Sequence, residues 1–511
     1  MKLGQFEFLK YVFRSKRHVY LDHNATTSVS RRVRHTMNRI LKHHYGNPSS
    51  LYKIAGKSAG FIEQARHRVA DAIHADPLEI CFTGCATESN NAVLKSLSAY
   101  CLPKKKKIIS TPIEHHSVIN TLEYLKTQGI TVEYCPVDRW GRVLLPELEK
   151  QLDEDTFLLC CVLANNETGV IQDIAAITRM AHQHDVLVLA DCVQALGKIP
   201  VDVHEWGIDY ASFSAHKLHG PKGVGALYVK QGSPFTALLH GGHQENGMRA
   251  GTESVHNIAG FGAACKDVGR LLARSNRIRA LKNDMVQRLK AIKPDCMVNT
   301  PQADEESLPN TLSITFNGIE NTELMAALNY RGIAVSAGSA CTTGDNKPSH
   351  VLKAIGLSDE AARETIRISL GCGTSAQDIR YTARVVQDHL EGQRPLLVSR
   401  IAPAQLDETI LFDDRTYILD IRSPGERRKS KSLPNSHEVN PFKLKKYLHQ
   451  LPKDKHIIVV CPGGGHSFII AYYLKSQGFK NVSDVRGGLE SWKILRSDLY
   501  RKYAGQNITA V

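Results

Sequence analysis

Short apolar runs alternate with amphipathic stretches between residues 57 and 229. Runs such as 157–164 (FLLCCVLA) and 186–190 (VLVLA) are continuous, as in strands buried on both faces, whereas residues 57–75 place apolar side chains at helical spacing. Strands separated by helices of about 10 to 15 residues are typical of a parallel, doubly wound sheet. We therefore predict an α/β fold whose ligands bind beyond the carboxyl ends of the strands.

Two of the predicted strand ends carry a group suited to catalysis. Lys217 lies between the apolar runs 210–214 and 224–229. Burial lowers the pKa of an amine, and enzymes use such a lysine to form a Schiff base with an aldehyde cofactor. Asp191 directly follows the run VLVLA, where a carboxylate can keep a pyridine nitrogen protonated and make the ring an electron sink. Taken alone, Lys217 is equally consistent with a solvated lysine in a glycine-rich turn.

A phosphate site is predicted at the start of the helix that follows residue 85. Residues 87–90 (TESN) crowd this start, where free backbone N–H groups and the helix dipole suit a phosphate. An ordinary N-cap would explain the same residues. Together with Asp191 and Lys217, each at a strand end and in this order, they indicate pyridoxal 5′-phosphate.

Composition narrows the class of protein. A chain of 511 residues is too long for one core. Its longest apolar run is far shorter than the ~18 residues that span a bilayer, and no signal or transit peptide is evident, so we expect a cytoplasmic protein with no membrane contact. The net charge of +14 comes without a basic helix carrying interleaved aromatic residues, so we expect no direct nucleic-acid binding. None of the 12 cysteines forms a C-x-x-C pair, so metal-finger spacing is absent.

Residues 18–395 resemble the cysteine desulfurase family of fold-type I pyridoxal-phosphate enzymes. The resemblance is carried, in chain order, by YLDHNATT, GNPSS, ATES, EHHSV, NNETGVIQDI, ADCVQALGK, SFSAHKLHGPKG, MRAGTE, SAGSACTTG and TIRISLG. It implies a large doubly wound domain and a small α+β domain, pyridoxal 5′-phosphate as cofactor, L-cysteine as substrate and a homodimer.

The same resemblance implies roles for individual residues. Lys217 would form the Schiff base, Asp191 would pair with the ring nitrogen, and His115 would stack on the ring and move protons. The remaining expected cofactor contacts are Ala86, Thr87, Asn166, Gln194, Ser214, Ala215 and His216. Thr252 would complete the phosphate site of the neighbouring subunit. Arg367, with Asn166, would bind the substrate carboxylate, which suits a bidentate guanidinium.

Cys341 is the expected nucleophile. It lies in SAGSACTTGDNKPSHVL, a small, polar, glycine-containing loop before a helix, a setting that favours exposure over packing. The resemblance implies that Cys341 takes the sulfur of L-cysteine as a persulfide, leaving L-alanine, and passes it to acceptor proteins for iron–sulfur cluster assembly or tRNA thiolation. No resident metal is expected, although Cys341 is a candidate ligand of a transient iron–sulfur cluster shared with a scaffold. One departure from the family pattern is Cys372, where a bulky basic residue is frequent.

Residues 404–505 resemble a single rhodanese domain. Cys461 follows the strand HIIVV and precedes a helix opened by Ser467, where loop N–H groups and the helix dipole would stabilise a thiolate or persulfide. Asp420 and Arg422 match the family's strand-end pair. His466 stands where rhodaneses usually carry arginine, so an inactive domain used for docking is an alternative. The basic residues at 427, 428, 429 and 431 are either a docking face or a solvated loop.

The resemblances predict four parts of the chain, one of which contains two domains. They are an N-terminal extension (1–17), a desulfurase region (18–395) with a large domain (about 33–270) and a small domain (about 18–32 and 271–395), a linker (396–403) and a rhodanese-like domain (404–505). The predicted activity is a cysteine desulfurase that relays sulfur from Cys341 to Cys461. The alternatives are selenocysteine lyase or transaminase chemistry on the same cofactor, and a non-catalytic assembly partner.

Overall fold

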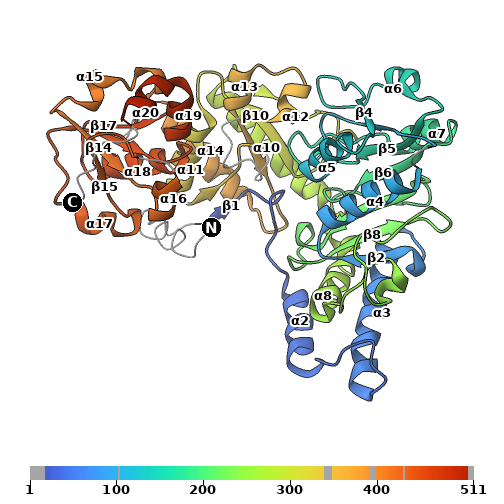
Figure 1. Cartoon of the computed structure of the whole chain (residues 1–511). Helices are drawn as coiled ribbons and strands as arrows, with labels where there is room; N and C mark the ends of the chain where they lie inside the picture. The colour runs from blue at the N-terminus through green and yellow to red at the C-terminus, as the bar shows by residue number, and fades with distance from the viewer. Residues whose placement is uncertain (1–17, 102–103, 339–347, 392–397, 430–431, 504–511) are drawn as a thin grey trace.

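The structure is a computed structural model that describes residues 18–101, 104–338, 348–391, 398–429 and 432–503. Three successive units lie along the chain (Figure 1). A seven-stranded sheet forms the first, a smaller antiparallel sheet the second, and a five-stranded parallel sheet the third.

The seven-stranded sheet has the order β2-β8-β7-β6-β5-β3-β4. Its strands are β2 (Ile80–Thr83), β3 (Lys107–Ser110), β4 (Thr131–Tyr134), β5 (Thr156–Val162), β6 (Leu187–Asp191), β7 (Tyr210–Ser214) and β8 (Gly225–Val229). Neighbouring strands pair in parallel, except that β8 runs antiparallel to both β7 and β2. The predicted α/β fold with a mostly parallel sheet is confirmed.

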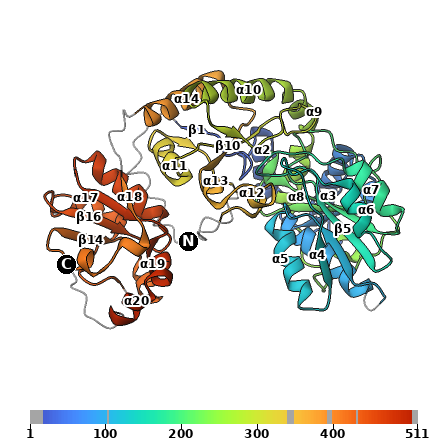
Figure 2. The ribbon, with the colours of Figure 1, turned by 90° about the horizontal axis from the view of Figure 1, so that it is seen from above.

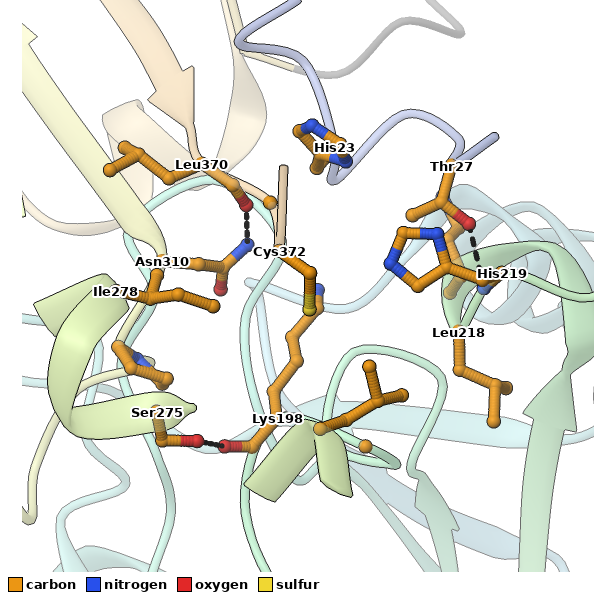
Figure 3. Close-up of a pocket in the computed structure, with 15 residues that line it drawn as sticks. His23, Thr27, Lys198, Leu218, His219, Ser275, Ile278, Asn310, Leu370 and Cys372 are labelled. Carbon is orange, nitrogen blue, oxygen red and sulfur yellow. Dashed lines mark hydrogen bonds between the residues drawn. The ribbon is translucent and has the colours of Figure 1, made fainter. Parts of the chain in front are cut away.

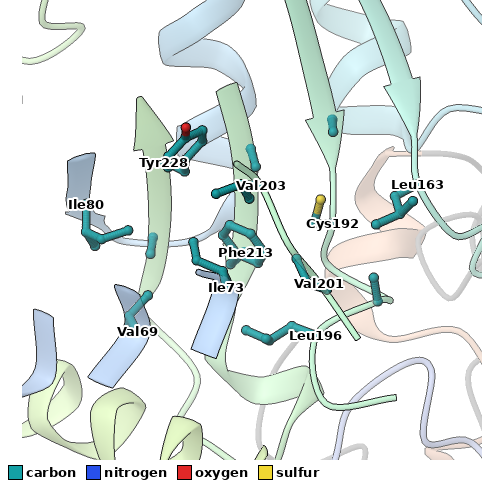
Figure 4. Close-up of a cluster of buried hydrophobic side chains, with 14 of the residues drawn as sticks. Val69, Ile73, Ile80, Leu163, Cys192, Leu196, Val201, Val203, Phe213 and Tyr228 are labelled. Atoms are coloured by element: carbon teal, nitrogen blue, oxygen red, sulfur yellow. The ribbon is translucent and has the colours of Figure 1, made fainter. Parts of the chain in front are cut away.

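Helices cover both faces of this sheet. The helices of this unit are α2 (Arg31–His43), α3 (Lys53–Ile73), α4 (Ala86–Cys101), α5 (His116–Lys126), α6 (Leu145–Gln151), α7 (Ile174–His182) and α8 (Val255–Cys265), and α2 packs on α8. Along β5 the side chains alternate between two cores, with Leu159 and Cys161 in one and Leu158 and Cys160 in the other. Figure 4 shows the first core, in which Phe213 and Tyr228 of the sheet lie among aliphatic side chains. Burial on both faces explains why these strands are continuous apolar runs.

The second unit combines the first described residues with a segment that follows α8. Its sheet contains β9 (Met297–Val298), β10 (Thr311–Thr315) and β12 (Thr365–Ser369), and β1 (Val19–Tyr20) pairs with β11 (Ile333–Ala334). The helices are α9 (Val268–Leu272), α10 (Ser275–Ile292), α11 (Asn321–Tyr330), α12 (His350–Ala354), α13 (Asp359–Arg363) and α14 (Ala376–Leu390).

The third unit is a parallel sheet of order β13-β17-β16-β14-β15. Its strands are β13 (Ser399–Ile401), β14 (Thr416–Asp420), β15 (Ser436–Glu438), β16 (His456–Val460) and β17 (Val482–Val485). The helices are α15 (Glu408–Leu411), α16 (Pro424–Lys429), α17 (Leu444–Tyr447), α18 (Gly465–Ser476), α19 (Gly488–Leu495) and α20 (Ser497–Tyr503). Helix α18 begins at Gly465, two residues before the Ser467 start expected from the sequence.

The third unit packs on the second, away from the seven-stranded sheet (Figures 1 and 2). Helix α11 meets α18, Ala326 joins the hydrophobic core of the third unit, and the rings of Tyr330 and Tyr472 meet edge to face at 5.2 Å. Arg400 bridges the units by donating to Glu320. In the described part of the chain, no helix is long and apolar enough to cross a bilayer.

Candidate active site

Lys217 is presented by the turn that leaves the carboxyl end of β7. The strand ends at Ser214, and a 3₁₀ turn spans Ala215–Lys217. The Nζ of Lys217 donates to the backbone oxygens of Asn24 (2.6 Å) and Ala25 (3.0 Å). The lysine turn is thereby tied to a segment almost two hundred residues earlier in the chain.

Asp191 ends β6 and is only 6% exposed. Its Oδ1 accepts from the Val193 amide (3.0 Å) and its Oδ2 from Nδ2 of Asn90 (3.1 Å). Asn90 also donates to Ser117 Oγ (2.9 Å), which lies 2.9 Å from Nδ1 of His115. A hydrogen-bonded chain thus joins Asp191 to His115 through two residues from α4 and α5.

His115 caps α5 with its own ring. Its Nδ1 accepts from the Ser117 amide (3.1 Å), so the neutral ring carries its proton on Nε2. Burial lowers the pKa of His115, and the nearby carboxylate of Asp191 opposes that effect. His115 is therefore held as a neutral imidazole at neutral pH, the form that can take up a proton.

Arg367 is buried in β12 with 2% exposure. Its Nη1 donates to the Asn166 carbonyl (3.0 Å) and its Nη2 to Oδ1 of Asp22 (2.8 Å). Its buried Nε has no hydrogen-bond partner among the described residues. A buried guanidinium with an unused donor is suited to an anionic ligand.

Asn24 connects these residues, although nothing in the sequence beyond its place in YLDHNATT singles it out. Its side chain donates to the Asn166 carbonyl (3.1 Å) and accepts from Nζ of Lys198 (3.0 Å). Its backbone oxygen accepts from both Lys217 and Nε2 of Gln194 (2.9 Å). Burial lowers the pKa of Lys198 well below its ordinary value. Three predicted site residues therefore converge on one asparagine.

The predicted phosphate residues are brought together by strand register. Ser214 of β7 and Thr83 of β2 both pair with Gly225 of β8. A Cβ on Gly225 would lie 2.7 Å from Phe213 O and 2.9 Å from Ala86 N, so only glycine permits this approach. The start of α4, with buried Ala86 and exposed Thr87, consequently lies against the end of β7 and its turn.

Comparisons with known proteins show which families the chain matches. The aminotransferase class-V family matches residues 19–381, and the rhodanese-like domain family matches residues 402–495. The chain belongs to the aminotransferase class-V family. It is 39% identical to a cysteine desulfurase IscS of Dictyoglomus turgidum over 382 residues, 75% of this chain and 96% of that protein. It is 40% identical to a cysteine desulfurase of Trichormus azollae over 394 residues, 76% of this chain and 96% of that protein.

Solved structures support the same assignment. A structure described as a NifS-like protein has a TM-score of 0.69 at 40% identity and covers 73% of this chain and all of its own. A second, described as SspA in complex with cysteine, has a TM-score of 0.62 at 35% identity and covers 69% of this chain and 99% of its own. The resemblance seen in the sequence is confirmed, and the activity is that of a cysteine desulfurase carrying a rhodanese domain. These relatives do not favour selenocysteine lyase or transaminase chemistry.

The desulfurase cofactor is pyridoxal 5′-phosphate, and the residues of this chain fit it. An amine (Lys217), a buried carboxylate (Asp191) and a neutral imidazole (His115) are the groups that its aldehyde, ring nitrogen and ring face require. Asn90 Oδ1 and Ser212 Oγ, both beside Asp191, are buried without hydrogen-bond partners among the described residues. Such unsatisfied polar atoms are expected in a site shaped for a polar ligand.

A small cavity of about 40 Å³ is lined by Lys217 together with residues of the second unit. Figure 3 shows His23, Lys198, His219 and Cys372 around it. Burial lowers the pKa of His23 to about 4, and its Nδ1 is buried without a partner in the described part of the chain. Cys372, the departure from the family pattern, therefore lines the same cavity as Lys217.

The predicted nucleophile Cys341 lies outside the described residues. Thr252 is described and exposed, on the segment that precedes α8. Gln194 and the Asn166 carbonyl both contact Asn24, as described above. His216 precedes Lys217 in the same turn, and its Nδ1 lies 3.1 Å from Thr26 Oγ1.

The rhodanese cysteine, Cys461, follows β16 and is 2% exposed. The backbone N–H groups of Gly464 (3.1 Å) and Ser467 (3.2 Å) donate to its sulfur, and Ser467 Oγ lies 3.3 Å away. Burial raises the pKa of Cys461, and these hydrogen bonds oppose the rise. The predicted Asp420–Arg422 pair is present, with Nη2 donating to Oδ2 at 2.7 Å, while His466 is exposed.

The buried carboxyl of Glu114, next to His115, should make the stability of the protein depend on pH. Burial raises its pKa to about 8, above the value of about 4.5 in an unfolded chain. Between these values the folded chain keeps a proton that the unfolded chain has released, so this group's contribution to stability falls as pH rises. Glutamine is uncharged at every pH. The free energy of unfolding of Glu114→Gln should therefore fall less between about pH 6 and pH 9 than that of the wild type, by on the order of 2 kcal/mol.

Thermal unfolding at the two pH values measures this effect. Glu149→Gln, at an exposed position in the same domain, is the matched control and should keep the wild-type difference. A Glu114→Gln variant with the wild-type pH dependence would show the prediction to be wrong.

Proposed function

We propose that Lys217, Asp191, His115 and Arg367 carry the desulfurase reaction and that Cys341 receives the sulfur of L-cysteine. The observation that carries this proposal is the pair of hydrogen-bonded chains described above. One joins Asp191 to His115, and the other joins Lys217 to Gln194 through Asn24. They hold an amine, an acid and a base at one edge of the sheet.

Each of these residues has a distinct task. The buried Arg367 binds the substrate carboxylate through its fork, which Asp22 and the Asn166 carbonyl orient. His115 accepts or returns a proton as the reaction proceeds, and the Asn90–Ser117 chain fixes its ring. Bound pyridoxal phosphate supplies a ring that withdraws electrons from the substrate and weakens its bond to sulfur. One similar structure is described as a complex with cysteine, which supports this substrate.

We also propose that sulfur passes from Cys341 to Cys461. The thiolate of Cys461 attacks the terminal sulfur of the Cys341 persulfide, a new S–S bond forms at Cys461, and the old S–S bond breaks. The electron pair of that bond leaves with Cys341 as a thiolate, so no external oxidant or reductant is needed. The N–H donors around Cys461 support this role, because they stabilise a thiolate and a persulfide alike.

Mass spectrometry of both cysteines after incubation with sulfur-labelled L-cysteine tests the proposal. We expect labelled persulfide on Cys341 and then on Cys461 in the wild type. Cys341→Ala should keep the yellow colour but lose label at both sites, with sulfide release reduced about 10²-fold or more. Cys461→Ser should keep alanine production and hold the label on Cys341.

Cys101→Ser, at the far end of α4, is the control and should behave as wild type. Full sulfide release by Cys341→Ala would refute its role as nucleophile. Label that never leaves Cys341 in the wild type would remove the relay and leave the rhodanese domain as a docking module.

A second copy of the chain is the proposed structural partner, with Thr252 reaching the neighbouring phosphate site. The segment that leads to Thr252 is anchored by Glu245, whose carboxylate accepts from Arg66 at 2.8 and 2.9 Å. Exposed apolar side chains also gather between α2 and α3, at Tyr45, Leu51 and Tyr52, as expected of a surface that meets another protein.

The proposed final acceptors are iron–sulfur scaffolds or carriers for tRNA thiolation. A reducing, cytoplasmic location is proposed because the described cysteines are unpaired.

A further inference from the structure

The hydroxyl of Ser467 links the Cys461 sulfur to a buried charged pair. Ser467 and Asp484 have no exposed surface, and Ser467 Oγ lies 3.3 Å from Cys461 Sγ and 3.4 Å from Asp484 Oδ2. It also lies 3.1 Å from the Gly464 carbonyl. A hydroxyl has one proton to donate, so Asp484 and Gly464 compete with the sulfur for it.

The state of the sulfur decides which way this hydroxyl turns. A neutral Cys461 thiol can donate to Ser467 Oγ, leaving the hydroxyl proton for Asp484 or Gly464. A thiolate or a persulfide anion needs the opposite arrangement, in which the hydroxyl donates to the sulfur. An anionic sulfur at Cys461 is therefore stabilised by the hydroxyl only when Asp484 and Gly464 do not hold its proton.

Arg400 weakens the hold of Asp484 on that hydroxyl. Its Nε donates to Oδ1 of Asp484 (3.0 Å) and its Nη2 to Oδ2 (3.2 Å), so both carboxylate oxygens are engaged. Its remaining nitrogen, Nη1, donates to Glu320 and to Thr322 Oγ1 (2.8 Å), both from the desulfurase part of the chain. The guanidinium also lies over the Phe468 ring, 5.0 Å from its centroid.

We propose that Arg400 and Asp484 are positioning residues for the Cys461 sulfur and that they act through the Ser467 hydroxyl. The proposal rests on the sulfur-accepting role of Cys461 given above. Neither residue touches the sulfur. Arg400 neutralises and orients Asp484, Asp484 sets how readily Ser467 turns, and Ser467 stabilises the anion. The desulfurase unit, through Glu320, holds the guanidinium in place for this task.

Other charged groups stand on the elements around Cys461. They are Asp420 at the end of β14 with its partner Arg422, Arg486 after β17, His466 in α18 and Glu490 in α19. Arg486 pairs with the same Glu320, at 3.1 Å. These groups stay unchanged in the variants proposed next, so differences between variants report on Arg400 and Asp484.

The test is the pH dependence of Cys461 alkylation by iodoacetamide in the full-length holoenzyme, followed by mass spectrometry of the Cys461 peptide. The midpoint of the rate profile reports ionisation, while the plateau at high pH reports access to the buried sulfur. We expect Arg400→Gln to raise the midpoint by about one unit, a roughly tenfold slower reaction at neutral pH. Asp484→Asn should lower it by about half a unit, because the anion that competes for the hydroxyl is gone.

Opposite shifts distinguish positioning from general damage, since loosening the loop would move both variants the same way. Arg400→Lys keeps the charge but not the fork, and we expect it to recover part of the Arg400→Gln shift. Arg415→Gln removes an exposed cation that pairs with Asp413 before β14, at the opposite end of the sheet, and should leave the midpoint unchanged. Thermal melts confirm that each variant is folded.

Shifts of the same sign in Arg400→Gln and Asp484→Asn, or shifts no larger than in Arg415→Gln, would overturn the proposal. The measurement contains no L-cysteine, so it does not depend on sulfur transfer. If the midpoints move as expected while labelled sulfur never reaches Cys461, the positioning network stands and the relay fails.

Discussion

Lys217→Ala is expected to lose both the yellow colour of the holoenzyme and the release of alanine from L-cysteine. The Schiff base needs an uncharged amine within reach of the aldehyde, and an alanine offers none. The Nζ of Lys217 is held by the Asn24 and Ala25 carbonyls at the edge of the sheet where Asp191 also lies. We expect turnover to fall by about 10³-fold or more, measured as alanine released per enzyme, with the visible absorbance spectrum recorded on the same samples.

Two further variants separate the chemistry of this amine from its charge and burial. Lys217→Arg keeps the positive charge but forms no Schiff base, so it should also be colourless and inactive. Lys282→Met removes another buried lysine, whose Nζ donates to Ser307 Oγ and Leu308 O at 3.1 Å in the second unit, and should remain yellow and active. A Lys217→Ala protein that retains the yellow colour would contradict the proposed role.

Asp191→Asn is expected to bind the cofactor but to turn over about 10³-fold more slowly. An amide has nearly the shape of the carboxylate, and its contact with the Val193 amide can persist. It lacks the negative charge that keeps the pyridine nitrogen protonated, so the ring withdraws electrons less strongly. The change should therefore lower kcat much more than it raises KM, which steady-state kinetics with L-cysteine would measure.

Asp209→Asn is the matched control for this variant. Asp209 is also buried and bonded to a backbone amide, that of Val188 at 2.8 Å, but it lies at the opposite end of the same sheet. We expect Asp209→Asn to reduce thermal stability and to leave kcat within about twofold of wild type. Equal losses of kcat in the two variants would show that Asp191 acts only as a structural carboxylate.

The sequence located those parts of the site that depend on local pattern. Asp191 and Lys217 stand where apolar runs end, and in a parallel sheet such ends share one edge. The sequence pattern therefore predicts that both residues lie at the same edge of the sheet. The fold class followed from the same alternation of strands and helices.

Residues that act through tertiary contact could not be found in this way. Asn24 meets Lys217 across 193 positions of the chain, and Asn90 meets Asp191 across 101. The sequence pattern predicts that Asn90 belongs to a helix start suited to a phosphate, but its side chain donates to the Asp191 carboxylate at the end of β6. Arg400 is a similar case, because its contact with Glu320 joins β13 of the third unit to the start of α11 in the second. Spacing along the chain carries no signal for such pairs.

The pocket that holds the Cys461 sulfur is specified largely by main chain. Two of its donors are backbone amides, and a Cβ on Gly488, where φ is +64°, would lie 2.3 Å from the Pro462 carbonyl and 2.5 Å from the Gly464 amide. His466, in the first turn of α18, has an exposed side chain, so a substitution there would leave these backbone donors to the sulfur in place.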